Sequence, residues 1–358
     1  MPALNAALIL DPPGGYESGG GLVSVTAGSG RKGFLNGDKE TARFDWPTGV
    51  AVDRNGNLFV TDYNNNVIRK INPFGWVETF SGRGEAGFTD GPASEAKFHG
   101  PDAIALDRVG NLLVADAENY RIRRITPSGQ ASTLAGSGVQ GDLEGPALEA
   151  QFVYPTGVAI DRDGNVYVAD RGANRIKKIS TDGSLVILAG TGKPGLKDGP
   201  AYSAEFNDPM TVAVDDEGNV YVADSGSHAI RRIDRGGMVT TIAGSGLPGF
   251  RDGMGDRARF NWPTGLAVDP RGNLVVSDSR NNRIRRIKLP EGGVTTLAGR
   301  GNAGFGNGPG GWAKFNFPIG VAVDHLGNIY VADTANQMIR NISPGLLRVD
   351  SSSALPHR

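Results

Sequence analysis

One pattern of apolar and polar residues recurs six times along the chain. In its first copy, valines alternate with small residues over positions 49–52, a polar stretch follows, and a second apolar run, 58–61, ends at Asp62. The closing aspartate returns after 54 residues each time, and after 55 in the last interval. Its six copies are Asp62, Asp116, Asp170, Asp224, Asp278 and Asp333. A regular repeat near this length is typical of proteins built as rings or stacks of one supersecondary unit.

Each unit predicts four short strands. In the first unit they cover residues 49–53, 58–62, 67–71 and 76–80, where apolar positions alternate with a period of two and no helical period is present. Gly56 lies between the first two strands, where a tight hairpin requires positive φ. Every first strand has a small residue at its centre, as Ala51 shows, which favours the crowded middle of a ring.

Six such meanders predict an all-β fold, a single six-bladed β-propeller of four-stranded antiparallel blades. The last unit contains only its first three strands, over 320–342, before a degenerate tail. The missing strand matches residues 22–28, which align with 238–244 of the fourth unit. We therefore expect the N-terminal strand to close the ring, with a propeller over 21–345 between tails at 1–20 and 346–358.

Composition narrows the function. Glycine is abundant, 54 of 358 residues, while a hydrophobic content of 39% is enough for a core, so the chain is folded and rich in turns. With no cysteine, disulfides, thiolate catalysis and cysteine metal sites are excluded. A net charge of −1 argues against an electrostatic grip on nucleic acid or a membrane. Residues 1–10 lack the basic start of a signal peptide, which favours the cytoplasm, and we expect a soluble monomer.

A second motif follows each closing aspartate, as in Val114-Ala-Asp-Ala-Glu-Asn-Tyr-Arg-Ile122. This motif resembles the NHL-repeat family, and the resemblance extends over all six units. The resemblance implies a six-bladed propeller. The family motif has a histidine just before its third strand, and in this chain only His228 matches that histidine. The other residues at this position, here called the histidine slot, are Asn66, Tyr120, Asn174, Asn282 and Gln337.

Two motifs that imitate cofactor sites belong to turns. The pattern G-x-G-x-x-G at Gly28 recurs in all units without the following helix that a dinucleotide site needs, so no NAD or other cofactor is predicted. The turn Asp161-Arg-Asp-Gly-Asn165 lacks the later ligands of a calcium loop. Family lyases hold zinc with several histidines, and related lactonases hold calcium, but neither ligand set can be traced here, so no metal site is assigned.

The third strands are basic, and some NHL propellers bind RNA. A basic residue recurs once per unit, matching the closing aspartates in number. These residues are Arg69, Arg123, Lys177, Arg231, Arg285 and Arg340. Equal numbers in every unit predict ion pairs from blade to blade and a charge spread around the ring, which leaves RNA binding as a third hypothesis.

Equivalent positions of the six units, here called slots, that hold the same residue throughout are explained by the fold. Slots whose residue differs from unit to unit therefore indicate where function lies. They cluster in the loops between fourth and first strands and between second and third, which a propeller brings to one face. The candidate ligand-binding rim comprises Trp46, Tyr63, His99, Asp102, Tyr154, Arg171, Asp208, Trp262 and Phe317. Aromatic anchors with a few polar groups are typical of interfaces and of small-molecule sites. The competing interpretation is that the aromatics only cover blade junctions.

We therefore expect a non-catalytic binding or scaffold propeller that presents this rim to a protein or a small molecule, with no catalytic residue assigned. The alternative is a propeller hydrolase or lyase, lactonase-like or like the amidating lyases, with a metal in the channel.

Overall fold

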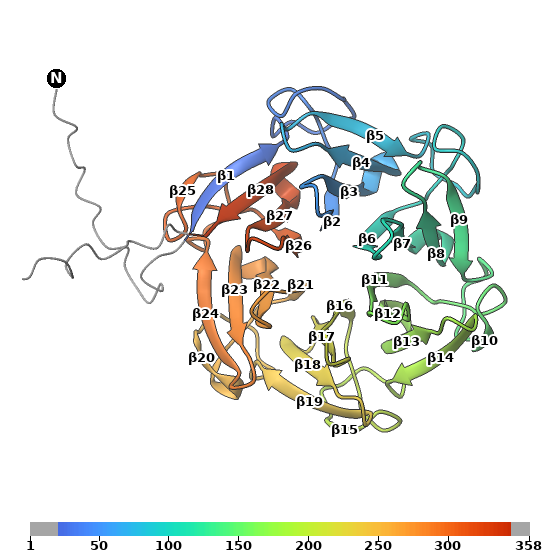
Figure 1. Cartoon of the computed structure of the whole chain (residues 1–358). Coiled ribbons are helices and arrows are strands. Elements are labelled where there is room, and N and C mark those ends of the chain that lie inside the picture. Colours follow the sequence, from blue (N-terminus) through green and yellow to red (C-terminus); the bar gives the residue numbers. More distant parts are fainter. Residues whose placement is uncertain (1–20, 345–358) are drawn as a thin grey trace, which may run out of the picture.

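The structure, a computed structural model, describes residues 21–344 as a closed ring of six antiparallel sheets (Figure 1). The all-β, six-bladed fold expected from the repeat is confirmed. The predicted tails, 1–20 and 346–358, lie outside the described residues. Each sheet is one blade, and neighbouring blades pack face to face around the axis of the ring.

The four strands of each blade run outward from this axis. The innermost strands, for blades 1 to 6, are β2 (Pro47–Val52), β6 (Pro101–Leu106), β11 (Pro155–Ile160), β16 (Pro209–Val214), β21 (Pro263–Val268) and β26 (Pro318–Val323). The second strands are β3 (Leu58–Asp62), β7 (Leu112–Asp116), β12 (Val166–Asp170), β17 (Val220–Asp224), β22 (Leu274–Asp278) and β27 (Ile329–Asp333). The third strands are β4 (Val67–Ile71), β8 (Arg121–Ile125), β13 (Arg175–Ile179), β18 (Ala229–Ile233), β23 (Arg283–Lys288) and β28 (Met338–Ser343). The outer strands are β5 (Val77–Ser81), β9 (Ala131–Ala135), β14 (Ser184–Ala189), β19 (Met238–Ala243), β24 (Gly293–Ala298) and, in blade 6, β1 (Leu22–Ala27).

Ring closure by the N-terminal strand is confirmed. β1 pairs antiparallel with β28, with Val23 opposite Ile342 and Val25 opposite Arg340. In Figure 1 the blue β1 lies beside the red β28, so the two ends of the described chain complete one blade. This pairing gives the last blade the outer strand that its own sequence lacks.

A fifth, two-residue strand covers the outer edge of four blades, which the sequence pattern did not predict. These short strands are β10 (Gly145–Pro146), β15 (Gly199–Pro200), β20 (Gly253–Met254) and β25 (Gly308–Pro309). In blades 1 and 2 a single bridge takes the same place, Gly37 to Val77 and Gly91 to Ala131. The long loop that joins one blade to the next thus shields an edge that would otherwise be open to pairing.

A buried ion pair stands inside every blade, which corrects the expectation of blade-to-blade pairs. Asp62 on β3 and Arg69 on β4 of the same blade are 2.7 Å apart, and both side chains are fully buried. Arg69 also holds the loop between β1 and β2, because its guanidinium donates to the carbonyls of Leu35 and Arg43. Burial raises the pKa of Asp62 to about 6, although the adjacent guanidinium opposes the shift. The basic residue predicted as an ion-pair partner in each unit is therefore buried and structural at all six positions.

Candidate functional site

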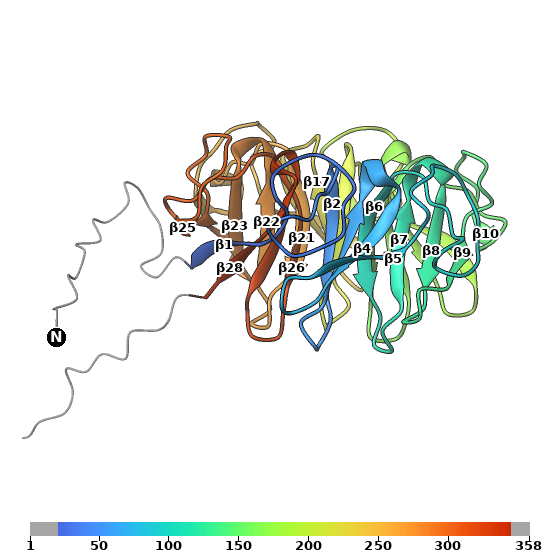
Figure 2. The ribbon, with the colours of Figure 1, turned by 90° about the horizontal axis from the view of Figure 1, so that it is seen from above.

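The two faces of the ring differ in the length of their connections. Figure 2 shows the ring from its side, with the blue hairpin between β2 and β3 on the lower face. The opposite face, here called the rim face, carries the loops that enter each blade and a short helical turn between the second and third strands. In five blades this turn is a 3-10 helix: η1 (Tyr63–Asn65), η2 (Ala117–Asn119), η3 (Arg171–Ala173), η5 (Ser279–Asn281) and η6 (Thr334–Asn336).

Each turn on the rim face ends in a residue with a left-handed backbone, with φ between 51° and 57°. These are the residues of the histidine slot, from Asn66 to Gln337. In five of the six junctions the slot side chain accepts a hydrogen bond from the residue that precedes the proline of the next blade. Asn174 accepts the N–H of Asp208 at 3.0 Å, and His228 Nδ1 accepts that of Trp262 at 3.1 Å.

These hydrogen bonds stabilise an unusual backbone conformation in the pre-proline residue that donates its N–H. Residues before proline avoid helical conformations, and positive φ is rare outside glycine. Nevertheless, all five pre-proline residues bonded in this way have positive φ: Trp46, Gly100, Asp208, Trp262 and Phe317.

Tyr120 is the one slot residue whose side chain does not accept this bond, and the pre-proline residue of the next blade, Tyr154, has a different backbone. The ring of Tyr120 packs against the core between blades 2 and 3. The N–H of Tyr154 turns instead to Asp170 Oδ1 at 2.8 Å, and Tyr154 does not adopt positive φ. The backbone of Tyr154 therefore differs from that of the other five residues of its slot.

The side chain of Tyr154 belongs to a cluster of three side chains from three blades, here called the tyrosine–glutamate cluster. The hydroxyl of Tyr154 donates to Glu118 Oε1 at 2.8 Å, and that of Tyr63 lies 3.0 Å from the same oxygen. The two hydroxyls are 2.9 Å apart. A Cβ at Gly100 would lie 2.9 Å from Tyr63 Cζ and 2.8 Å from Glu118 Cγ, so glycine in that slot makes room for the cluster.

Burial raises the pKa of both phenols above the ordinary value of about 10. It raises the pKa of Tyr63 to about 12, and the negative charge of Glu118 adds to the rise. The pKa of Tyr154 is raised too, by burial and then by its bonds to Tyr63 and Glu118. The cluster thus gathers two phenol hydroxyls and one carboxyl group at one point of the rim face, and all three side chains are half-buried.

Asp102 stands next to this cluster at the start of β6. It is only 9% exposed, and the same slot holds Thr48, Thr156, Met210, Thr264 and Ile319 in the other blades. Burial raises the pKa of Asp102 to about 7, against the opposing effects of the Thr48 hydroxyl and Arg171, and the charge of Glu118 raises it further. Asp102 is therefore a carboxyl that changes charge near neutral pH.

Arg171 and Asp208 extend the polar region to blade 4. Arg171 Nε is 3.1 Å from Asp208 Oδ1, and about a third of each side chain is exposed. In blades 4 to 6 the slot of Tyr63 and Arg171 holds small hydroxyl residues, which donate to the proline carbonyl of the next blade. These bonds run from Ser225 to Pro263, from Ser279 to Pro318 and from Thr334 to Pro47. The departures from the repeat thus gather over blades 1 to 4, here called the polar half of the rim.

The remaining four candidates do not bond to these polar side chains. Trp46 and Phe317 have ring centroids 6.3 Å apart. Trp262 lies against His228, and the guanidinium of Arg280 is 4.4 Å from its ring centroid. His99 is exposed, its backbone N–H donates to Asp116 Oδ1, and its carbonyl accepts the N–H of Glu118.

The nine predicted residues therefore separate into groups. Tyr63, Asp102, Tyr154, Arg171 and Asp208 are linked by hydrogen bonds or by their charges. The sequence interpretation missed Glu118, which joins them. Its signal was available, because Glu118 is the only acid in a slot that otherwise holds Asn64, Gly172, Gly226, Arg280 and Ala335.

Over residues 21–344 no group of three histidine, aspartate or glutamate side chains is arranged to hold a metal ion. In the same part of the chain, no helix has the length and apolar character needed to cross a membrane.

Solved structures resemble this ring in fold. A Bacteroides thetaiotaomicron protein of unknown function aligns with a TM-score of 0.71 at 19% identity, over 90% of this chain and 75% of that one. An auxiliary nutrient binding protein of the same organism gives a TM-score of 0.69 at 18% identity, over 90% and 76%. Virginiamycin B lyase from Staphylococcus aureus gives 0.52 at 18% identity, over 86% and 97%.

Curated relatives are longer than this chain. Protein SUPPRESSOR OF QUENCHING 1, chloroplastic, of Arabidopsis thaliana is 31% identical over 84% of the chain, and NHL repeat-containing protein 2 of Bos taurus is 30% identical over 82%. The chain spans only 30% of the first relative and 46% of the second.

The NHL repeat model matches residues 44–71, 152–179, 206–233, 260–287 and 315–340. These matched residues do not include blade 2, which supplies Gly100, Glu118 and Tyr120. With five matched repeats, relatives named for the same repeat and a closed six-bladed ring, the chain belongs to the NHL-repeat family of β-propellers.

Proposed function

We propose that this propeller is a binding platform whose ligand contacts the polar half of the rim. The observation that carries the proposal is the tyrosine–glutamate cluster. Three blades each supply one of its side chains, and each side chain stands where its unit departs from the repeat. The departures extend to the backbone, since the glycine at position 100 and the altered φ of Tyr154 are both needed to form the cluster.

The chemistry of this region suits a polar ligand held by directional bonds. Half-exposed tyrosine and arginine side chains are enriched where proteins bind partners, because each combines apolar area with hydrogen-bond donors. Here two phenols and the Arg171 guanidinium are already oriented by Glu118 and Asp208. Side chains that are held in place before binding lose less entropy when a ligand arrives.

The comparisons support a binding module in general terms. One structural neighbour is named as a nutrient-binding protein, and the curated relatives are more than twice as long as the chain that matches them. The proposed ligand is therefore either a small molecule or a protein segment, and we place it across blades 1 to 4.

The proposal is tested with the double variant Tyr154→Phe, Arg171→Ala. Wild-type and variant proteins are used to capture ligands from a cell extract, and bound proteins and small molecules are identified by mass spectrometry. We expect a ligand retained by the wild type to be reduced about tenfold or more by the variant, since hot-spot side chains contribute roughly 2 kcal/mol.

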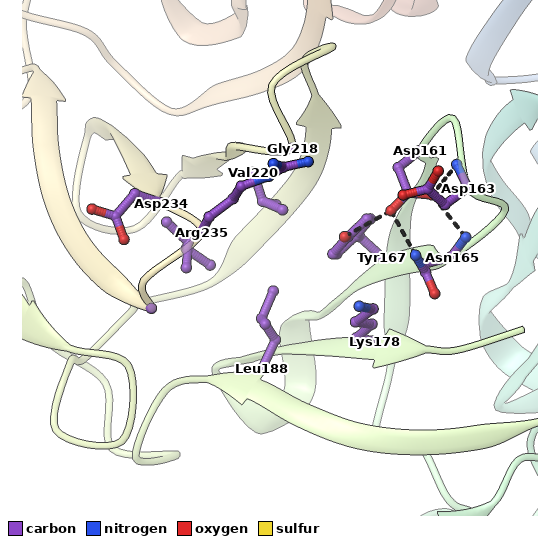
Figure 3. Close-up of a pocket in the computed structure, with 12 residues that line it drawn as sticks. Asp161, Asp163, Asn165, Tyr167, Lys178, Leu188, Gly218, Val220, Asp234 and Arg235 are labelled. Atoms are coloured by element: carbon purple, nitrogen blue, oxygen red, sulfur yellow. Dashed lines mark hydrogen bonds between the residues drawn. The ribbon is translucent and has the colours of Figure 1, made fainter. Parts of the chain in front are cut away.

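The matched control is Tyr167→Phe, on the opposite face. Tyr167 also donates its hydroxyl to a carboxylate, that of Asp161 at 3.0 Å (Figure 3). The control should retain the ligand at the wild-type level. If all three proteins capture the same molecules in the same amounts, the polar half of the rim is not the binding surface.

A further inference from the structure

Blade 5 departs from the repeat on the lower face of the ring, opposite the rim face. This face carries the hairpins between first and second strands and is here called the hairpin face. The connection from β23 to β24 has one residue more than in the other blades, which produces the single spacing of 55 residues. In the other five blades the asparagine of the first hairpin donates its amide to the aspartate at 2.7–2.8 Å. In blade 5 the distances from Asn273 to Asp269 are 3.3 and 3.4 Å, and Asn273 Oδ1 accepts the N–H of Leu289 instead.

A groove of about 740 Å³ lies beside this altered hairpin. Arg271 of the first hairpin, Arg286 of β23 and Lys288 at the end of β23 line it, together with Met254 and Leu289. The wall therefore combines three cationic side chains with two flexible apolar ones. This volume lies in the range of small-molecule sites.

Two of the three cationic side chains, Arg271 and Lys288, are specific to blade 5. The slot of Arg271 holds Asn55, Val109, Asp163, Glu217 and Leu326 in the other blades. The slot of Lys288 holds Asn72, Thr126, Ser180, Asp234 and Ser343. A basic residue in both slots of one blade is not a requirement of the fold, because five blades form without it.

The nearby carboxylates are occupied by partners of their own. Asp252 also lines the groove, but its oxygens accept bonds from Arg285 and from Thr296. Asp269 is 7% exposed in its side chain and lies 3.6 Å from Arg286 Nε, while it accepts backbone bonds from its own turn. The groove therefore retains an excess of positive charge toward a ligand.

A second pocket on the same face shows the opposite charge. It has a volume of about 230 Å³ and lies between blades 3 and 4, where Figure 3 shows Asp161, Asp163 and Asp234 with Lys178 and Arg235. Two of its acids, Asp163 and Asp234, stand in the slots that Arg271 and Lys288 occupy in blade 5. The hairpin face thus builds hollows of either sign, and the residues in these slots decide which.

We infer that the groove of blade 5 binds a small organic anion, with a phosphate or carboxylate head between Arg271 and Lys288 and a short apolar tail along Met254 and Leu289. Charge-assisted bonds to two side chains hold the head, and burial of the tail adds affinity with each methylene group that leaves water. This site is independent of the rim.

Isothermal titration calorimetry with hexyl phosphate, hexanoate and inorganic phosphate tests the inference. We expect saturable binding of hexyl phosphate or hexanoate, and the stronger of the two identifies the head group. Inorganic phosphate should bind more weakly than hexyl phosphate, because it has no tail. The double variant Arg271→Asn, Lys288→Ser, which installs residues found in other blades, should weaken binding about tenfold or more.

The matched control is Arg232→Gln, which removes the blade-4 equivalent of Arg286 and should leave the titration unchanged. The inference is overturned if neither hexyl compound binds, or if the double variant binds as the wild type does. Equal affinities for inorganic phosphate and hexyl phosphate would overturn the assignment of an apolar tail. Melting curves of the variants confirm that a loss of binding is not a loss of fold.

Discussion

The left-handed residue that ends each helical turn controls the direction of the next blade's pre-proline side chain. An acceptor at this residue fixes the following N–H and holds the pre-proline backbone at positive φ, as Asn174 does for Asp208. Tyr120 provides no acceptor, and Tyr154 reaches Glu118 as a result. We therefore expect the side chain at position 120 to determine, given the space left by Gly100, whether Tyr154 reaches the cluster.

The variant Tyr120→Asn should restore the acceptor and dissolve the cluster. We expect the N–H of Tyr154 to bond to the introduced amide oxygen, its φ to become positive and its hydroxyl to leave Glu118, all visible in a crystal structure. Compared with Tyr120→Phe, which also lacks the tyrosine at position 120, spectrophotometric titration should then show one more tyrosine ionising near its ordinary pKa of about 10. Tyr120→Phe, which has no acceptor either, is the control and should keep the cluster. An intact cluster in Tyr120→Asn would show that the slot does not control it.

Asp102 should make stability depend on pH near neutrality. Its folded pKa, about 7, lies above the unfolded value. The stability that its neutral form contributes is therefore complete below about pH 4 and is lost as the pH rises through 7. Between pH 4 and 8 the wild type should lose roughly 2–4 kcal/mol relative to Asp102→Asn, measured by urea unfolding. A difference between wild type and Asp102→Asn that stays flat over this pH range would contradict the assignment.

At the scale of elements, the strands were predictable because their signals are local. Period-two apolar runs and turn glycines such as Gly56 lie within a few residues of the structures they specify. The two-residue fifth strands were not predicted, since three Gly-Pro pairs and one Gly-Met pair bond to the sheet through their backbones and are too short to show an alternation of apolar and polar side chains. Glu118 was missed for a different reason. Its partners, Tyr63 and Tyr154, are 55 and 36 residues away in sequence, and only the closed ring brings them together.

The hairpins of the lower face provide a direct test of this local control. Gly164 has φ of 91°, and its N–H bonds to the carbonyl of Asp161. Gly164→Val should lower the free energy of unfolding by roughly 1–2 kcal/mol or more, because a β-branched side chain clashes at positive φ. Asp163→Val, one residue earlier in the same turn, should cost less. Equal losses in urea titrations would mean that the turn does not require glycine.

At the scale of the whole molecule, stability depends on closure. The cores lie between blades, so each blade buries its faces only against its neighbours, as Phe206 of the loop entering blade 4 packs with residues of blades 3 and 4. A ring has no unpaired end as long as the last blade is complete. Because β1 lies between β25 and β28, a strand from the start of the chain holds the final blade together.

Removal of β1 should therefore affect the entire ring. A protein lacking residues 1–27 exposes the edge of β28 and loses Val23 and Ala27 from the core, where they are 1% and 0% exposed. We expect aggregation or a large drop in Tm, because an open edge pairs with other chains. Removal of 351–358 is the control and should leave Tm unchanged. A finer comparison keeps the chain intact: Val23→Ala should cost roughly 1–3 kcal/mol, whereas Leu22→Ala, at a position 55% exposed, should cost less than about 0.5 kcal/mol. A shortened protein that melts like the full chain would show that closure by β1 does not stabilise the ring.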